Sequence, residues 1–172
     1  MVTIVRDALL QEINEIASLT IEAYREYSQI LTSDNWEIMR TSLSNVAEIA
    51  KQGQLLIVQR DRELVGSVVY YPPGLSDSRL FQPEWASLRL LAVSPQHRGE
   101  GIGQQLSLEC IHRAQQDKAL TIGLHTSELM VVARRMYERL GFKQEIELPS
   151  RLGIKYWRYL LELAEIKNER SN

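Results

Sequence analysis

Three glycines lie close together in the segment 93–106, which reads VSPQHRGEGIGQQL. Gly99, Gly101 and Gly103 come just after Arg98, between an apolar run and a pattern typical of a helix. The first turn of a helix has backbone N–H groups without partners and carries the positive end of the helix dipole. Because glycine has no Cβ, a ligand can approach the backbone closely, and Arg98 adds a positive charge. The segment therefore predicts an anion site, most naturally for phosphate or pyrophosphate, in preference to a tight turn alone.

Two known phosphate-binding loops fit the segment less well. A P-loop needs a lysine and then serine or threonine after its last glycine, whereas Gln104 and Gln105 follow Gly103 here. A dinucleotide-binding loop needs a third glycine where this chain has Leu106. Glu128 lies roughly where an acid that binds ribose is expected, which is weak support. The first interpretation fails, and the second remains a minor alternative.

The surrounding pattern alternates between strands and helices. Apolar runs and alternation predict strands at 2–8, 54–61, 63–71, 85–93, 119–126, 142–148 and 154–163. Helical spacing predicts helices at 9–31, 32–53, 101–116 and 127–140. We expect Asp34 to cap the second helix and Gly53 to end it, and Ser127 to cap the fourth helix and Gly141 to follow it. In the helix 101–116, one apolar stripe should contain Ile102, Leu106, Cys110 and Ala114.

This order predicts an α/β protein of the mixed-sheet (α+β) kind. The strand–helix–strand unit in the middle implies two parallel neighbours with a right-handed crossover, and the hairpins on either side imply antiparallel flanks. The predicted order therefore contains about seven mostly antiparallel strands with a central parallel pair, and about four helices. Residues 1–172 are expected to form a single domain, because that length suits one core.

The composition is ordinary for a globular protein, with 44% hydrophobic and 24% charged residues. A net charge of −2 gives no reason to expect nucleic acid or an anionic membrane as a partner. No apolar run approaches the length of a membrane span, and acidic residues come too early for a secretory signal. The single cysteine, Cys110, excludes an intrachain disulfide. We therefore expect a soluble cytoplasmic protein.

Two motifs together resemble the GCN5-related N-acetyltransferase (GNAT) family. Its pyrophosphate loop, R/Q-x-x-G-x-G/A, is matched by Arg98, Gly99, Glu100, Gly101, Ile102 and Gly103. Its second motif, A-x-x-x-Y-x-x-x-G-F, is matched in ARRMYERLGF by Ala133, Tyr137, Gly141 and Phe142. The resemblance covers residues 86–142, about a third of the chain, and the predicted element order agrees with the family's fold almost throughout. One departure is Val131, because many members have an asparagine there and its contact with the donor is lost or replaced.

The resemblance implies acetyl-CoA as the acyl donor. No metal is expected, because His97, His112 and His125 have no metal-ligand spacing. It implies that the backbone of residues 98–103 holds the pyrophosphate and that the pantetheine arm pairs with Leu91, Ala92 and Val93, where the strand separates from its neighbour. Ala133 and Tyr137 complete the implied donor contacts. A primary amine would attack the thioester directly in a ternary complex. The N–H of Val93 would stabilise the oxyanion, and Tyr137 would be the catalytic residue that protonates the leaving thiolate.

Several side chains have two interpretations in the sequence. Glu84 and His125 are candidates for a base that deprotonates the amine, although each is more simply a surface or sheet-end residue. Arg89, in an apolar strand, either binds a substrate carboxylate or, as the favoured alternative, forms a structural ion pair. Cys110 lies on the apolar stripe and is expected in the core, not in an acyl-enzyme. Of the three histidines, none has metal-ligand spacing relative to the others.

The acceptor is expected to be a primary amine of an unidentified small molecule or protein. Aromatic residues that could line its site, although most should simply pack, are Tyr24, Tyr27, Tyr70, Tyr71 and Trp85. A non-catalytic domain that binds or senses acyl-CoA on the same fold is the alternative, and Tyr137 with the complete glycine loop favours the enzyme. A homodimer through Tyr156, Trp157 and Tyr159 is possible, or these residues only complete the sheet.

Overall fold

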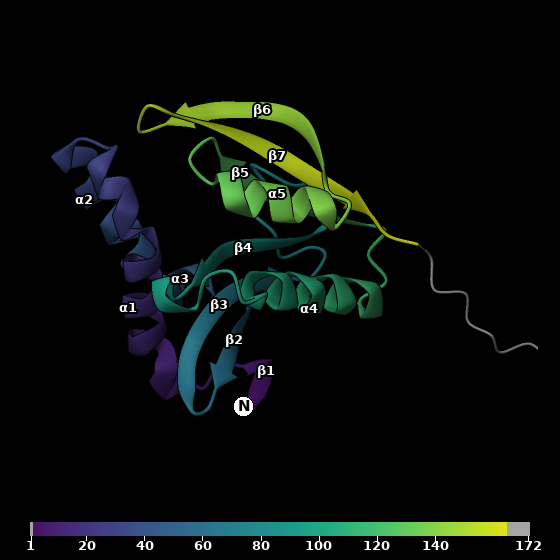
Figure 1. The fold of residues 1–172 in the computed structure, drawn as a ribbon. Helices are drawn as coiled ribbons and strands as arrows, with labels where there is room; N and C mark the ends of the chain where they lie inside the picture. The colour runs from purple at the N-terminus through teal and green to yellow at the C-terminus, as the bar shows by residue number, and fades with distance from the viewer. Residues whose placement is uncertain (1, 165–172) are drawn as a thin grey trace, which may run out of the picture.

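A seven-stranded sheet runs through the molecule in the order β1-β2-β3-β4-β5-β7-β6 (Figure 1). The computed structural model describes residues 2–164. The strands are β1 (Thr3–Asp7), β2 (Gln54–Arg60), β3 (Glu63–Tyr71), β4 (Ala86–Val93), β5 (Thr121–Ser127), β6 (Lys143–Arg151) and β7 (Ile154–Glu162). Only β4 and β5 are parallel among the described strand pairs, which confirms the predicted mixed sheet with one central parallel pair.

Five α-helices accompany the sheet in the described part of the chain, where about four were expected. They are α1 (Ile13–Tyr24), α2 (Ser33–Ser44), α3 (Val46–Ile49), α4 (Ile102–Gln116) and α5 (Val131–Arg139), with short 3₁₀ segments η1 (Leu10–Glu12), η2 (Arg25–Gln29) and η3 (Pro95–His97). The extra helix arises because Asn45, at φ −90° and ψ +43°, breaks the predicted helix 32–53 into α2 and α3. No helix in residues 2–164 is long and apolar enough to cross a membrane.

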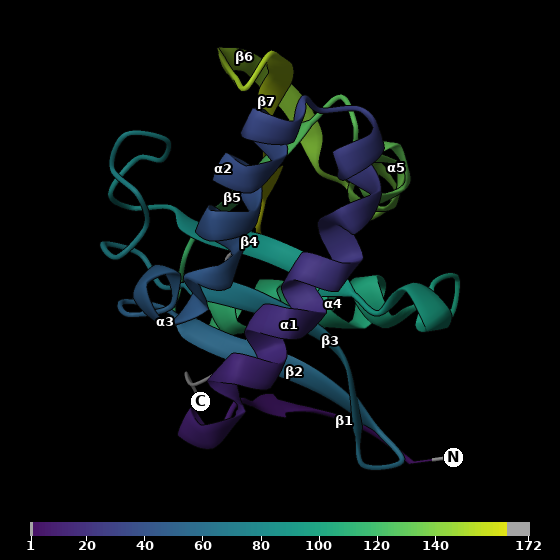
Figure 2. The ribbon, with the colours of Figure 1, turned by 90° about the vertical axis from the view of Figure 1, so that its left-hand side faces the viewer.

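Different helices cover the two faces of strands β1–β4. Leu56 and Val58 of β2 belong to the same core cluster as α4, whereas Ile57 between them packs with Ile16 of α1. Because successive side chains of a strand point to opposite faces, α1 and α4 lie on opposite sides of the sheet. Figure 2 shows α1 crossing in front of β2 and β3, with α4 behind them.

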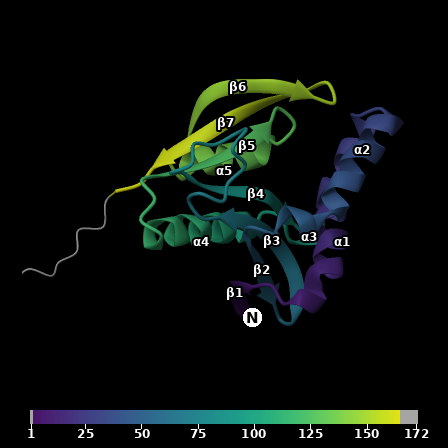
Figure 3. The same ribbon diagram turned by 180° about the vertical axis from the view of Figure 1, so that it is seen from behind.

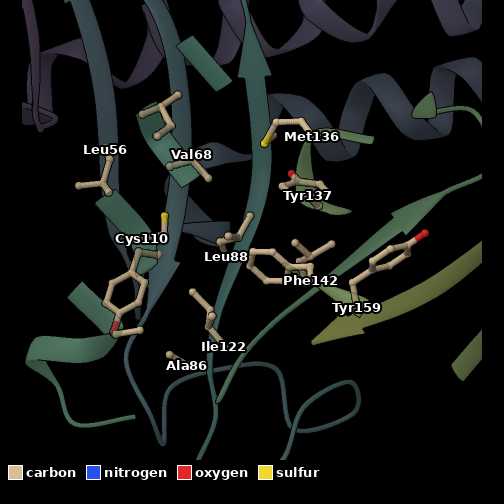
Figure 4. Close-up of a cluster of buried hydrophobic side chains, with 14 of the residues drawn as sticks. Leu56, Val68, Ala86, Leu88, Cys110, Ile122, Met136, Tyr137, Phe142 and Tyr159 are labelled. Atoms are coloured by element: carbon tan, nitrogen blue, oxygen red, sulfur yellow. The ribbon is translucent and has the colours of Figure 1, made fainter. Parts of the chain in front are cut away.

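The core forms as the helical spacing of α4 predicted. Its stripe of Ile102, Leu106, Cys110 and Ala114 is buried against the sheet. Cys110 has no exposed surface and lies among Leu56, Val68 and Leu88 (Figure 4), which confirms its expected place in the core. Burial also raises the pKa of the thiol, so it stays protonated and inert.

Strand β5 is covered on its two faces by different parts of the chain. Ile122 and Leu124 face the core that α5 completes. On the other face, the loop 72–85 lies over the strand (Figure 3) and places the Phe81 ring against Gly123, where a Cβ would come within 2.9 Å of the ring. The glycine therefore allows this loop to sit directly on the sheet.

Three of the four residues predicted at helix ends are wrong, and one of them is Gly53, because the second helical region already ends at Ile49. The Thr32 hydroxyl, not Asp34, caps α2 by accepting from the Asn35 N–H at 3.2 Å. Ser127 is the last residue of β5, and α5 begins only at Val131. Local residue type could not separate Thr32 from Asp34, since both are good caps two residues apart. By contrast, Gly141 follows α5 at φ +103°, as predicted for a glycine at a helix end.

Candidate active site

Strands β4 and β5 pair only where they begin. Their two pairs are Ala86 with Ile122 and Ser87 with Gly123, and beyond Ser87 the strands separate. A cavity of about 420 Å³ lies at the separation. Its walls include residues 88–91 of β4 and 124–126 of β5, together with residues from α1, α2, α5 and the β6–β7 turn. A cavity of this volume is typical of a site for a small molecule.

A β-bulge in β4 lies at this opening. Leu90 and Leu91 together oppose the single residue Val68 of β3. Leu90 has a φ of +62°, a conformation that costs a residue with a Cβ about 1–2 kcal/mol. Since a bulge bends its strand and increases the local twist, it turns β4 where the strand leaves β5.

The bulge leaves backbone groups of β4 open to the cavity side. The Ser94 N–H donates to the Val65 carbonyl of β3 at 2.8 Å. Successive backbone groups of a strand alternate in direction, so Val93 and Leu91 present theirs to the side from which β5 has departed. Ala92, between them, pairs with β3 instead. The edge of β4 therefore offers N–H groups to an extended ligand.

Two tyrosine hydroxyls lie on this cavity. Tyr24 of α1 donates to the carbonyl of Leu91 at 2.9 Å, and burial raises its pKa, so the donor stays protonated. Tyr137 of α5 is almost completely buried, with its ring edge-to-face on Phe142 at 5.7 Å between centroids. Burial raises the pKa of Tyr137 well above the usual 10. Its hydroxyl has no hydrogen-bond partner in residues 2–164, so its proton can serve a group in the cavity.

The N-terminus of α4 is open to an anion. Gly99 and Gly101 have φ of +76° and +79°, and a Cβ on either would meet no atom within 4 Å. Gly101 is the N-cap, and it supplies no capping side chain. Within residues 2–164, no side chain accepts from the N–H groups of residues 99–104. Gly103 has an ordinary φ, and a Cβ at this position would lie 3.6 Å from the Val93 side chain. A small side chain would therefore fit at this position.

The charged side chains of the loop turn away from this opening. The Arg98 guanidinium donates to the Ala23 carbonyl at 2.8 Å and to Glu26 at 3.1 Å. Glu100 pairs with Arg60 of β2. The charge of Arg98, expected to serve the anion, is thus shared with Glu26 and ties the loop to α1, and the backbone is left as the anion-binding surface.

Three basic side chains line the cavity: Arg89 of β4, His125 of β5 and Arg151 at the end of β6. Burial, then Arg89 and Arg151, lower the pKa of His125 to about 4, so the imidazole is neutral at pH 7. Its Nδ1 is buried and has no partner among the described residues. The other base candidate, Glu84, is exposed before β4 and does not line the cavity.

The aromatic residues separate into two groups. Tyr24 lines the cavity, and Tyr27 packs against its edge at 5.7 Å between centroids. The others hold the fold together: Tyr70 donates to Asp117 at 2.7 Å, Tyr71 donates to the Ile49 carbonyl, and Trp85 lies 5.0 Å from the guanidinium of Arg158. The general expectation that most would simply pack is confirmed.

Several cavity residues carry no local signal in the sequence. They come from α2 and the β6–β7 hairpin and include Met39, Leu43, Arg151, Leu152 and Tyr156. Their spacing along the chain resembles that of any half-buried helix or strand. They line the cavity only because tertiary packing brings α2 and the hairpin to the carboxyl end of β4 (Figure 2).

A mixed sheet whose parallel pair opens beside a helix N-terminus is the fold expected from the family resemblance, and the comparisons with known proteins confirm the family. The Acetyltransferase (GNAT) family model matches residues 11–142, so the chain belongs to this family. Comparison with curated protein sequences finds no match.

Solved structures share the fold. A Corynebacterium glutamicum protein described as "histone acetyltransferase HPA2 and related acetyltransferase" has a TM-score of 0.73 and 22% identity, over 97% of this chain and 99% of that one. The PaiA N-acetyltransferase of Thermoplasma acidophilum, solved with coenzyme A, has a TM-score of 0.71 and 17% identity, over 92% and 98%. The ribosomal-protein-S18-alanine N-acetyltransferase of Escherichia coli has a TM-score of 0.68 and 16% identity, over 99% of each chain.

Proposed function

We propose that this chain is an acetyl-CoA-dependent N-acetyltransferase, which transfers the acetyl group to a primary amine of a small molecule or protein. The observation that carries the proposal is the separation of β4 from β5 beside the uncapped N-terminus of α4. An open strand edge suits an amide-rich arm, and the helix mouth suits a pyrophosphate. Coenzyme A contains both groups, and the Thermoplasma relative was solved with coenzyme A.

In this proposal the donor lies along β4 and α4. The backbone of residues 98–103 holds the pyrophosphate, with Gly99 and Gly101 leaving room for its oxygens. Leu91 and Val93 pair with the pantetheine arm, with Ala92 between them turned to β3. Ala133 and Tyr137 of α5 line the opposite wall.

The proposed reaction is a direct attack within a ternary complex. The amine, after losing its proton to solvent, attacks the thioester carbonyl, so a C–N bond forms and the C–S bond breaks. The Val93 N–H faces the oxygen that gains charge, and the Tyr137 hydroxyl gives its proton to the leaving sulfur. The attacking nitrogen loses its extra proton, which passes through solvent to the Tyr137 phenolate and restores the hydroxyl. Orientation in the cavity supplies most of the acceleration, about 7–11 kcal/mol in well-oriented systems. His125 lies close by, but a base with a pKa of about 4 is weak, so it is a poor candidate to deprotonate the amine.

The test is release of coenzyme A thiol from acetyl-CoA with a broad panel of amines. The variant Tyr137→Phe should lower kcat about 100-fold or more, since a positioned acid contributes about 10²–10⁴-fold. Its dissociation constant for coenzyme A, measured by calorimetry, should stay within twofold. Tyr159→Phe is the matched control, because that buried hydroxyl bonds Glu138 and Gln144, away from the cavity. Unchanged turnover in Tyr137→Phe would remove this residue from the mechanism.

The competing function is a non-catalytic domain that binds or senses acyl-CoA. Its signature would be tight coenzyme A binding with no thiol release for any amine in the panel. The unpartnered hydroxyl of Tyr137 at the cavity favours the enzyme, because a purely binding domain has no need of an available proton donor there.

A further inference from the structure

The cavity is basic, although the chain as a whole is slightly acidic. Arg89, His125 and Arg151 line it, and no aspartate or glutamate does among the described residues. The chain carries a net charge of −2, so this local excess of positive charge does not follow from the overall composition. A positively charged cavity is unexpected in an acetyltransferase, because arginine side chains repel a protonated amine that approaches the cavity.

Arg89 has no anionic partner within residues 2–164. In the described part of the chain, no carboxylate oxygen lies within 4.0 Å of its guanidinium, so the structural ion pair favoured by the sequence is not formed. Arg89 lowers the pKa of Asp77 only slightly. The main cause of that lowered pKa is Arg79, whose Nη2 lies 2.9 Å from Oδ2 of Asp77. A partly buried guanidinium without a counterion pays a desolvation cost that a bound anion would offset.

Arg151 is held over the opposite side of the cavity by the β6–β7 turn. Leu152 and Gly153 form this turn with φ of +53° and +75°. The Asn35 side chain of α2 donates to the Leu152 carbonyl at 3.4 Å, and Leu152 packs with Met39 in one apolar cluster. The turn is thus anchored to α2, and the exposed residue Arg151 lines the cavity from it.

Between these arginines, His125 offers a hydrogen-bonding atom without a partner. Its Nδ1 is buried, and no group in residues 2–164 bonds to it. A neutral imidazole can carry its proton on either nitrogen, so Nδ1 can donate to an oxygen of a ligand. Buried polar atoms are nearly always paired in folded proteins, and this one points to a group that binds in the cavity.

We propose, on the basis of the function proposed above, that the acceptor is a small amine that also carries a carboxylate. The planar guanidinium of Arg89 binds the carboxylate through two parallel hydrogen bonds, Arg151 adds charge from the turn, and His125 donates from Nδ1. The cavity of about 420 Å³ must also admit the acetyl end of the donor, which favours an amino acid or a compound of similar size. The same charges exclude polyamines and lysine-rich peptides by repulsion.

The test compares amines in matched sets of three. Each set contains an amino acid, its amide and its decarboxylated amine, with aromatic, aliphatic and acidic side chains in turn, and spermidine is added as a polycation. The acid of at least one set should have a kcat/KM about 10- to 100-fold above its amide, as expected for hydrogen bonds to a charged group. Thiol release that favours the amides, the decarboxylated amines or spermidine would overturn the proposal.

Variants assign the effect to Arg89. Arg89→Gln should lower kcat/KM for the acid at least about 10-fold more than kcat/KM for its amide, so that the preference for the acid is lost. Arg89→Lys should recover part of the preference, and Arg151→Gln should weaken it by a smaller factor. Arg40→Gln is the matched control, because Arg40 is a partly exposed arginine of α2 that is paired with Glu37 and lies outside the cavity wall. An equal loss with acid and amide in Arg89→Gln would contradict the proposal.

Binding measurements separate this proposal from the proposed function. Calorimetry with coenzyme A present should show that the preferred acid binds and that Arg89→Gln weakens its binding about 10-fold or more. Binding of this kind without any thiol release would keep the carboxylate site and refute the acetyltransferase. Thiol release without a preference for acids would support the acetyltransferase and refute the carboxylate site. Failure of every acid to bind or react would overturn the carboxylate site.

Discussion

Among the individual residues, His125 shows how the cavity controls charge. Its imidazole lies between the rings of Phe81 and Tyr156, at 6.5 and 6.1 Å between centroids. Burial and the two arginines keep it neutral, with its pKa lowered from 6.5 to about 4. An uncharged imidazole adds no further repulsion toward an incoming ammonium, yet it can still donate to a carboxylate.

This lowered pKa makes stability depend on pH. In the unfolded chain the imidazole takes up a proton as the pH falls below 6.5, whereas in the folded protein it does so only near pH 4. Protonation therefore favours the unfolded state between these values, and stability is lost as the pH falls through this window. The shift corresponds to about 2 kcal/mol between pH 7 and pH 5.

The measurement is urea unfolding at pH 7 and at pH 5, for the wild type and His125→Gln. The variant should lose about 2 kcal/mol less than the wild type over this step, because glutamine does not titrate. His112→Gln is the control, since His112 is exposed on α4 and does not line the cavity. Equal pH dependence in the wild type and His125→Gln would show that His125 is not held neutral.

Among the elements, α4 combines a packed body with an open beginning. Its buried stripe fixes the helix on the sheet, whereas Gly99 and Gly101 leave its first N–H groups accessible. The packing depends on the buried stripe, and the access of a ligand depends on the glycines before it. The helix can therefore be firmly packed and still bind a ligand at its N-terminus.

Replacing Gly101 should separate these two properties. Gly101→Ala forces a Cβ onto a residue at φ +79°, which costs about 1–2 kcal/mol of folding stability. The Cβ meets no protein atom, but it enters the space proposed for the pyrophosphate, so the dissociation constant for coenzyme A should rise at least about 10-fold. Gly74→Ala, at φ +87° in a distant loop and equally unobstructed, should cost similar stability and leave coenzyme A binding unchanged. Calorimetry measures the dissociation constant for coenzyme A, and urea unfolding measures the loss of folding stability. Equal affinities for coenzyme A in the two variants would argue against a pyrophosphate at α4.

The sequence predicts the features that depend on local pattern. The stripe of α4, the hairpin of β2 and β3 and the terminal Gly141 arise from spacing or residue type within a few positions, and the parallel pair follows from the strand–helix–strand order. It does not predict the bulge at Leu90, because nothing about a leucine there favours a positive φ. It also misses the contact of Tyr24 with the Leu91 carbonyl, since those residues are 67 positions apart. The acceptor side of the cavity is likewise not predicted, because tertiary packing brings its residues together from distant parts of the chain.

At the scale of the whole molecule, the single cysteine reports on folding. Cys110 is buried under α4 at the centre of the main core cluster, and burial raises its pKa. A thiol reagent can reach it only when α4 leaves the sheet. The wild type should therefore react with a disulfide reagent only as fast as the protein opens, and completely in urea. Ser78→Cys adds an exposed thiol and should give one rapid equivalent as a control. Rapid reaction of the wild type under native conditions would contradict this packing.

The aromatic residues expected at a dimer interface are used within the chain. Tyr159 is fully buried, Tyr156 lines the cavity, and Trp157 packs against the core with the Arg134 guanidinium 5.0 Å from its ring. This is what completion of the sheet requires. A homodimer stays a prediction, and it would need another surface or the outer edges of these side chains.

Part of the acceptor side of the cavity lies beyond the segment that the family model matches. The family match ends at residue 142 and includes β4, α4 and α5, whereas Arg151 and Tyr156 lie in the hairpin beyond it. The turn of this hairpin contacts α2 through the hydrogen bond from Asn35 to the Leu152 carbonyl and through an apolar cluster, whereas β7 itself is paired with β5. Recombination that exchanges residues 148–156 between relatives could thus change the amine that is accepted without rebuilding the acyl-donor half, which gives evolution, or an engineer, a short cassette for new specificity.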